Sequence, residues 1–542
     1  MSTKIQCIKG RIVDVINRKI FPGEVTIERG QITAVKEVSG DVPDQYIMPG
    51  FTDSHIHIES SMLVPSEFAK LAVRHGTVAT ISDPHEIANV CGMEGVEFMI
   101  ENGKQVPLKF HFGAPSCVPA TTFETAGAEL DATDVEKLMQ RDDIWYLAEV
   151  MNWPGVLNRE ESLMKKIKAA EKAGKPVDGH APGLRGDQAK KYADAGISTD
   201  HECFTREEAE DKLAAGMTIL IREGSAAKNY EALISLFNDH PGRLMFCSDD
   251  KHPDDLLRGH INELIARSLK RGYDLFDLLH AACVLPVKHY NIPVGLLQIG
   301  DSADFVVVDD LDTIHITQTW IDGMCVYRDG KDFIPDVKWS PINNFTSRET
   351  SPEDFILAPD KKLWPVIEAH DGELITGKLT EEMPSENGNV PPDVSRDILK
   401  VSVVNRYEKA DPAVGFIKNF GLKDGAIASS VAHDSHNIIA VGTSEEYLSR
   451  VANMVMENKG GIAAVNRNDE LVLPLPVAGI MSNLPGEEVA RRYEALNKMA
   501  HEMGSRMKAP FMSISFMALL VIPSLKISDL GMFDGDTFSF VE

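Results

Sequence analysis

The sequence has no CxxC pair, although its 542 residues include seven cysteines. Because these cysteines are scattered, a zinc ribbon or a thioredoxin-type redox pair is excluded, and a reducing compartment is indicated. The first residues lack the long apolar core of a signal peptide. The apolar run from Phe516 to Ile522 is followed by Pro523 and is too short to span a bilayer. These absences predict a cytoplasmic protein without a membrane partner.

Basic residues are also scarce, with 55 lysines and arginines against 82 aspartates and glutamates and a formal net charge of −27. An acidic surface repels nucleic acid and anionic membranes, so neither is expected as a partner. The apolar fraction of 43% and the charged fraction of 25% are typical of soluble globular proteins. The length exceeds what one hydrophobic core supports, which predicts several domains.

Short apolar runs alternate with amphipathic segments between residues 51 and 290. Eight runs have the pattern of strands: 50–58, 76–83, 107–115, 144–150, 175–181, 196–202, 216–223 and 242–250. Amphipathic segments such as 159–174 and 230–240 separate them. This eightfold alternation predicts an α/β fold with a closed (β/α)8 TIM-type barrel. An open, doubly wound sheet is the alternative, because alternation alone does not show closure.

Strand-like segments with turn residues between them also precede and follow this region. Residues 1–50 and 291–345 are predicted to form one small β-sandwich domain, because the two ends of a domain often lie close together. The polar, proline-containing stretch 346–397 predicts a linker or loop-rich boundary. Residues 398–542 mix both kinds of pattern and predict a further α+β domain.

Histidines and carboxylates stand at the ends of several predicted barrel strands. His55 and His57 end the first, and residues two apart in a strand point to the same side, so both imidazoles can reach one ion. One such pair is a weak signal in a chain with 17 histidines, and a single strand-end histidine is more often structural. Four other strands, however, end in Glu149, His180, His201 and Asp249. Catalytic groups cluster at this end of such barrels, so the six residues predict a metal site.

The six donors are four imidazoles and two carboxylates, without a thiolate. Such a set suits Zn, Mn or Fe and exceeds what one four-coordinate ion needs. We therefore predict two divalent ions about 3.5 Å apart, bridged by Glu149, which lower the pKa of a bound water toward about 7. Asp249 is the predicted base for the water proton, which it would pass to a leaving group. The chain is thus predicted to be a metal-dependent hydrolase.

The six residues as a set resemble the amidohydrolase superfamily, and longer stretches resemble the adenine deaminases of bacteria and archaea. In the barrel these are MPGFTDSHIHIESSMLVPSEFA, TISDPHEIANV, DGHAPGL, STDHE, IREGSAAKN and FCSDDKHPDDL. In the last domain they are ASSVAHDSHNIIAVG and NRNDELVLPLPVAGIMSN. The resemblance implies hydrolysis of adenine, a small purine base, to hypoxanthine and ammonia. It also implies a binuclear centre, expected to hold Mn²⁺ with Fe²⁺ or Zn²⁺ as alternatives, and Asp249 and Glu149 as the catalytic residues.

Two other functions stay open. The chain could be another amidohydrolase that acts on a cyclic amide or a different nucleobase, or a barrel that has lost catalysis and serves for binding. One position departs from many mononuclear deaminases of the superfamily, which carry a glutamate three residues after the strand-five histidine. Here His180 is followed by Ala-Pro-Gly, so the proton for the purine is expected from Asp249 or another residue at the barrel mouth. A homo-oligomer is expected only because such barrels commonly pair.

Other polar residues are candidates for contact with the substrate. They follow the second and seventh predicted strands and are His85, Glu86, Glu223 and Ser225. Acidic groups near His85 can instead stabilise the start of a helix, and Glu223 can instead pair with Arg222. In the last domain, His433, Asp434 and His436 are expected either to form a hydrogen-bonded turn or to serve the function, by reaching over the barrel mouth or by binding another ion.

Overall fold

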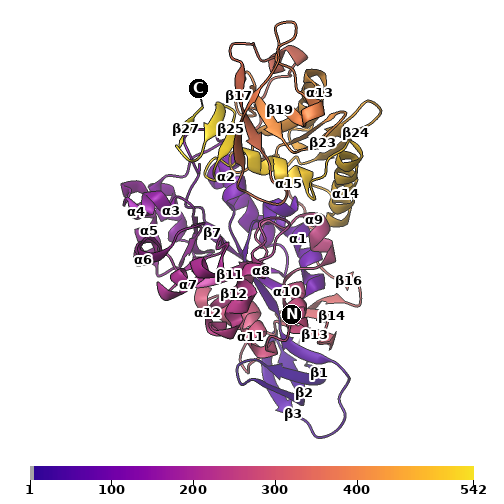
Figure 1. Cartoon of the computed structure of the whole chain (residues 1–542). Coiled ribbons are helices and arrows are strands. Elements are labelled where there is room, and N and C mark those ends of the chain that lie inside the picture. Colours follow the sequence, from indigo (N-terminus) through magenta and orange to yellow (C-terminus); the bar gives the residue numbers. More distant parts are fainter. Residues whose placement is uncertain (1–4, 542) are drawn as a thin grey trace.

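The computed structural model describes residues 5–541. Residues 1–4 and residue 542 lie outside this range. The expectation that the chain has no signal peptide rests in part on residues 1–4. The chain forms three regions in a row, with a sheet at one end, a helix-wrapped barrel in the middle and a second α/β region at the other end (Figure 1). None of the helices within residues 5–541 is long and apolar enough to cross a bilayer.

Eight parallel strands make up the barrel, and they follow one another in chain order. They are β5 (Phe51–Ile56), β6 (Thr77–Ser82), β7 (Lys109–Ala114), β8 (Ile144–Val150), β9 (Val177–Gly179), β10 (Thr199–Asp200), β11 (Thr218–Arg222) and β12 (Leu244–Cys247). The amide of Ser198 donates to the carbonyl of Val177 at 2.9 Å and joins β9 to β10. The amide of Asp249 donates to the carbonyl of His55 at 2.9 Å and joins β12 to β5. These bonds close the ring, as a barrel requires and an open sheet does not.

Local sequence explains both the strands and the helices around them. Every residue of β5, β6, β11 and β12 is buried, as expected for parallel strands with a filled interior on one side and helices on the other. Helix α5 (Glu161–Ala173) buries Leu163, Ile167 and Ala170 on one face and ends at Gly174. Gly174 has a φ of 66°, a left-handed conformation in which the absence of a Cβ avoids a clash. The amphipathic segment predicted at 159–174 is therefore a helix.

The chain segments on either side of the barrel share one eight-stranded sheet. Its members are β1 (Gln6–Asp14), β2 (Lys19–Glu28), β3 (Gln31–Glu37), β4 (Tyr46–Pro49), β13 (Phe305–Asp310), β14 (His315–Ile321), β15 (Met324–Arg328) and β16 (Lys331–Asp332). Strand β4 pairs with β13 and thereby joins the two segments. Because β4 leads directly into β5, this sheet also anchors the strand that carries the first two candidate ligands.

The C-terminal region contains a second eight-stranded sheet, in the order β18-β17-β20-β19-β22-β21-β23-β24. Its strands are β17 (Leu363–Glu368), β18 (Gly377–Glu382), β19 (Ile398–Val404), β20 (Ala413–Lys418), β21 (Ala426–Ser429), β22 (Ile438–Gly442), β23 (Gly461–Val465) and β24 (Glu470–Pro474). Helix α13 (Glu445–Glu457) packs on it.

The structure corrects the expectation of a linker at 346–397, because β17 and β18 lie within that stretch. Strand β18 is the edge of the sheet and alternates exposed and half-buried residues, so its sequence is as polar as a loop. Pro365 lies in β17 just before the residues that pair with β20, where it removes no bond from that pairing. The polar residues of an edge strand and a proline within a strand therefore led to the expectation of a linker.

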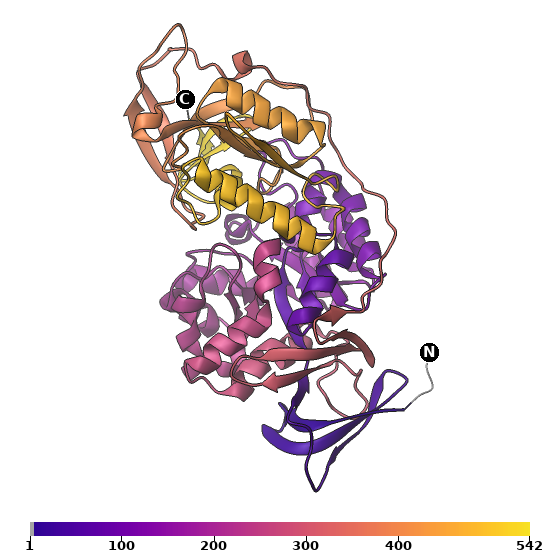
Figure 2. The same ribbon diagram turned by 90° about the vertical axis from the view of Figure 1, so that its right-hand side faces the viewer.

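The C-terminal region covers the carboxyl ends of the barrel strands. Helix α14 (Gly486–Glu502) lies along the boundary between the two regions (Figure 2). Its Tyr493 hydroxyl lies 2.6 Å from Nδ1 of His252, just after β12. The amide of Ser482 donates to the carbonyl of Met62 at 2.8 Å. These contacts join the two regions, and residues of both line one cavity.

Candidate active site

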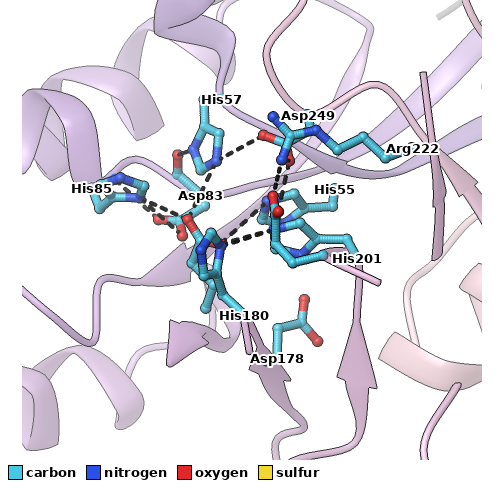
Figure 3. A network of polar contacts seen from close by, with 12 residues as sticks. His55, His57, Asp83, His85, Asp178, His180, His201, Arg222 and Asp249 are labelled. Atoms are coloured by element: carbon cyan, nitrogen blue, oxygen red, sulfur yellow. Dashed lines mark hydrogen bonds and ion pairs between the residues drawn. The ribbon is translucent and has the colours of Figure 1, made fainter. Parts of the chain in front are cut away.

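Six side chains that follow barrel strands converge at one point, and five of them are labelled in Figure 3. They are the predicted ligands His55, His57, Glu149, His180, His201 and Asp249. The carboxylate of Glu149 lies 2.8 Å from Nδ1 of His180 and 3.0 Å from Nε2 of His201. It also lies 3.4 Å from Nε2 of His57 and 3.9 Å from Nε2 of His55. Glu149 is therefore the centre of the cluster.

Asp249 lies just beyond the end of β12 rather than within the strand. It has a φ of 54°, a left-handed conformation that aspartate tolerates better than most residues. Its carboxylate lies 3.3 Å from Nε2 of His57 and 3.5 Å from Nε2 of His201. The turn after the strand therefore directs Asp249 into the cluster, beside imidazoles from β5 and β10.

The cluster contains buried polar atoms without hydrogen bonds. Both ring nitrogens of His55 have no hydrogen-bond partner within the described chain. Buried polar groups are normally hydrogen-bonded, so such atoms need an explanation, and metal coordination is one. Burial lowers the pKa of His55 well below its usual value, which favours the neutral, metal-binding imidazole. The donor set thus fits divalent cations.

Residues after β6 extend the cluster on one side. Nδ1 of His85 lies 3.2 Å from Oδ2 of Asp83 and 3.6 Å from Oε1 of Glu149. The neighbouring Glu86 accepts hydrogen bonds from Nδ1 of His433, at 2.5 Å, and from Nε2 of His436. The C-terminal histidines therefore reach the barrel mouth, one of the arrangements expected for them, and fix the carboxylate of Glu86.

An apolar roof covers this polar floor. Five apolar side chains line the same cavity, four of them from the C-terminal part of the chain: Met151, Leu374, Phe516, Leu519 and Val521. The ring of Phe516 stacks on His433 at 5.1 Å between centroids. The cavity between roof and floor measures about 30 Å³. Sequence analysis missed this roof, because its apolar residues show no spacing that distinguishes them from a core segment.

Two candidates for substrate contact do not lie in this cavity. The carboxylate of Glu223 pairs with Arg267 at 2.7 Å, and Oγ of Ser225 donates to Asp255 at 2.6 Å. Arg222, the last residue of β11, points inward instead and lies 2.5 Å from the carboxylate of Asp249. Because neighbouring residues of a strand point to opposite sides, an inward Arg222 turns Glu223 away. The structure thus places Glu223 and Ser225 outside this cavity.

One buried lysine holds the roof in place. Nζ of Lys526 donates to the carbonyls of Leu374, at 2.6 Å, and of Phe516, at 3.1 Å, and both residues line the cavity. The side chain is fully buried, and this burial lowers the pKa of Lys526 from 10.5 to about 7. The folded protein therefore loses this proton at a lower pH than the unfolded chain does.

This difference predicts a pH dependence of stability. Between pH 7 and about 10 the unfolded chain binds a proton at Lys526 that the folded chain does not, so stability rises with pH in this window. Below about pH 7 both states bind the proton, and Lys526 gives no further pH dependence. In Lys526→Met this contribution is absent. We therefore subtract the thermal midpoint of Lys526→Met from that of the wild type at each pH. This difference should rise by a few degrees from pH 7 to pH 9. If this difference does not change with pH, Lys526 does not have the lowered pKa. Lys423→Met, which replaces an exposed lysine, serves as the control.

Comparison with known proteins finds two matching family models and relatives that align with nearly the whole chain. Residues 46–327 match the family model "Amidohydrolase family", and residues 373–539 match "Adenine deaminase C-terminal domain". A curated adenine deaminase from Salinibacter ruber is 53% identical over 537 residues, 99% of this chain and 98% of its own length. One from Methanosarcina mazei is 51% identical over 98% of both chains. A solved β-aspartyl dipeptidase from Fervidobacterium islandicum is 13% identical over 62% of this chain and all of its own, with a TM-score of 0.47.

Proposed function

The chain belongs to the adenine deaminases of the amidohydrolase family, and we propose that it hydrolyses adenine to hypoxanthine and ammonia at the cluster around Glu149. The observation that carries this proposal is the convergence of four imidazoles and two carboxylates beneath an apolar roof. A polar floor suits the hydrolytic step, and an apolar roof suits a flat, neutral base.

The cluster would hold two divalent cations, with Mn²⁺ as the expected metal and Fe²⁺ or Zn²⁺ as alternatives. His55, His57 and Asp249 can share one ion, since their ligand atoms lie together, and His180 and His201 can bind the other. Glu149 lies within 4 Å of all four imidazoles and can reach both. When bound, such ions supply Lewis-acid activation of water at neutral pH.

Asp249 provides the proton transfer in this proposal. Burial alone would raise the pKa of Asp249, but Arg222, His57 and His201 outweigh it and hold the pKa well below its usual value. The group is therefore a carboxylate, able to accept the proton of the water that adds to C6 of adenine. It then gives this proton to the exocyclic nitrogen, and cleavage of the C6–N bond releases ammonia. Oxygen replaces nitrogen at C6, and the second proton of the water ends on N1 of the ring, so adenine and water balance hypoxanthine and ammonia.

The C-terminal region contributes to recognition of the base. Phe516 and Leu519 would cover the flat face of the purine, while His85, Glu86 and Asp434 offer polar groups at its edge. Because His433 and His436 fix the carboxylate of Glu86, its oxygens keep one orientation toward the cavity. Glu86 would thereby select for the hydrogen-bonding pattern of the substrate.

The location, assembly, partners and domain limits of the protein are also part of this proposal. The protein would act in the cytoplasm as a homo-oligomer on a small purine base, without nucleic acid or a membrane as partner. Its domains would be 1–50 with 291–345, the barrel 51–290, and the C-terminal domain 398–542. The C-terminal sheet would include β17 and β18 from the preceding stretch 346–397.

Ammonia release from adenine tests both the metal and the substrate. Protein stripped of metal by a chelator should be inactive, and reloading with Mn²⁺ should restore ammonia release. The protein also has to be analysed for bound metal, so that the two parts of the proposal are separated. Two bound ions per chain without ammonia from adenine would reject this substrate and favour a cyclic amide or another base. Full activity without metal would reject the metal-dependent mechanism.

A further inference from the structure

A second cavity, of about 600 Å³, lies beside the barrel mouth. The segments after β11 and β12 line it together with helix α10 (Ile261–Lys270). Six cationic side chains surround it: Lys228, Lys251, Arg258, Arg267, Lys270 and Arg271. Only three carboxylates do so, those of Glu223, Asp255 and Glu263. In a chain with a net charge of −27, lysines gathered at one cavity call for a cause.

Lys251 is the residue that most needs an anionic partner. It is 5% exposed, and its Nζ makes no hydrogen bond to any residue within 5–541. The nearest carboxylate oxygen, of Glu263, lies 4.0 Å away, on a side chain that is itself 54% exposed. A buried ammonium without hydrogen bonds is costly, so a partner that enters the cavity would stabilise it.

The carboxylates in and beside the cavity pair with its arginines but leave its lysines without close partners. Glu231, just outside the lining, pairs with Arg271 at 2.6 Å and with Arg267. Glu223 pairs with Arg267 at 2.7 Å and Asp255 with Arg258 at 2.7 Å. Lys228 has only a distant contact with Glu223, at 3.9 Å, and Lys270 has no ion pair in the described part of the chain. Three ammonium groups of the cavity are thus left with little or no pairing.

One arginine of the cavity is held rigidly. Its guanidinium, that of Arg267, lies 3.9 Å from the ring centroid of Tyr230. Both of its terminal nitrogens already donate to carboxylates, Nη1 to Glu223 and Nη2 to Glu231, so the binding of a further anion is left to the lysines.

We propose that this cavity binds a phosphate monoester, with its dianionic phosphate on Lys251 and the neighbouring lysines. Several ammonium groups around one ligand favour a dianion over a single carboxylate. The volume falls in the range typical of small-molecule sites and exceeds what a phosphate group alone would fill, so the ligand carries an organic portion. The site is separate from the cavity of the proposed deaminase reaction, and neither proposal depends on the other.

Calorimetric titration of the metal-loaded protein with ribose 5-phosphate tests the site, with hypoxanthine present in excess to occupy the barrel cavity. Ribose 5-phosphate should bind, ribose should not, and Lys251→Met should weaken binding at least about 10-fold. Lys228→Met, across the same cavity, should also weaken it. Lys172→Met is the matched control, because this lysine is 79% exposed on α5 and lies outside the cavity lining. The affinity of this variant for ribose 5-phosphate should equal that of the wild type.

Inorganic phosphate forms a further arm of the experiment. If it binds as tightly as ribose 5-phosphate and is equally sensitive to Lys251→Met, the phosphate group alone provides the recognition, which supports the site. The proposal is overturned if ribose 5-phosphate does not bind the wild type. It is also overturned if the two lysine variants, shown to be folded by circular dichroism, bind it as the wild type does, because the ligand then lies elsewhere.

Discussion

Asp249→Asn is expected to lower kcat for adenine about 1,000-fold while the protein keeps its metal. Asparagine has nearly the same shape as aspartate but cannot accept a proton, whereas the other five predicted ligands are unchanged. Ammonia release gives kcat, and elemental analysis gives metal content. The matched control is Asp250→Asn, because Asp250 lines the same cavity but bonds to Arg222 at 3.1 Å and to Ser60 at 2.6 Å. We expect this control to reduce turnover far less.

Each result for Asp249→Asn has a distinct meaning. Nearly normal turnover would remove Asp249 from the proton transfer. Loss of turnover together with loss of metal would make Asp249 mainly a ligand and leave the base unidentified. Only a large fall in kcat with full metal content supports the proposed role.

Glu149→Gln is expected to abolish turnover and to weaken metal binding about 10- to 100-fold or more. The substitution removes the carboxylate charge that lies 2.8 to 3.9 Å from all four imidazoles. An amide can still coordinate through its oxygen but is a poorer bridge between two cations. Metal content at fixed free Mn²⁺, measured beside ammonia release, checks this result. Wild-type metal content in the variant would contradict the central position of Glu149.

Glu59→Gln provides the control for removal of a buried carboxylate at this site. Burial raises the pKa of Glu59 to about 7, so this group is already partly protonated at neutral pH. Glutamine therefore resembles a form that the wild type populates. We expect Glu59→Gln to keep its metal, which would show that the loss in Glu149→Gln depends on the position of the charge.

The barrel and the six clustered residues could be predicted because each depends on local sequence. His180 and His201 each directly follow a short buried strand, and the geometry of a parallel barrel places all such strand ends together. No long-range information is needed once the strands are recognised. This is why residues from five strands could be assigned to one cluster without knowledge of the packing.

The roof of the cavity and its supports could not be predicted in this way. Glu86 and His433 are 347 positions apart, and no periodic pattern connects them. Lys526 bonds to carbonyls 152 and 10 positions away, and a backbone carbonyl leaves no trace in the sequence. The sequence could not show that Glu223 faces away from the cavity for a different reason. A shift of one residue in strand register decides which of two neighbouring side chains points inward. Arg222 occupies the inward position.

The small volume of the barrel cavity, about 30 Å³, has a kinetic consequence. This space suits a single water molecule rather than a purine, so the described conformation is a closed one. We therefore expect the segment around Phe516 to move away from the barrel before adenine enters and before hypoxanthine leaves. This opening would free apolar side chains from their packing, and we expect it to be slower than simple diffusion. An enzyme built in this way excludes bulk water during the reaction, and its maximal rate reflects how often the roof opens as well as how fast the C–N bond breaks.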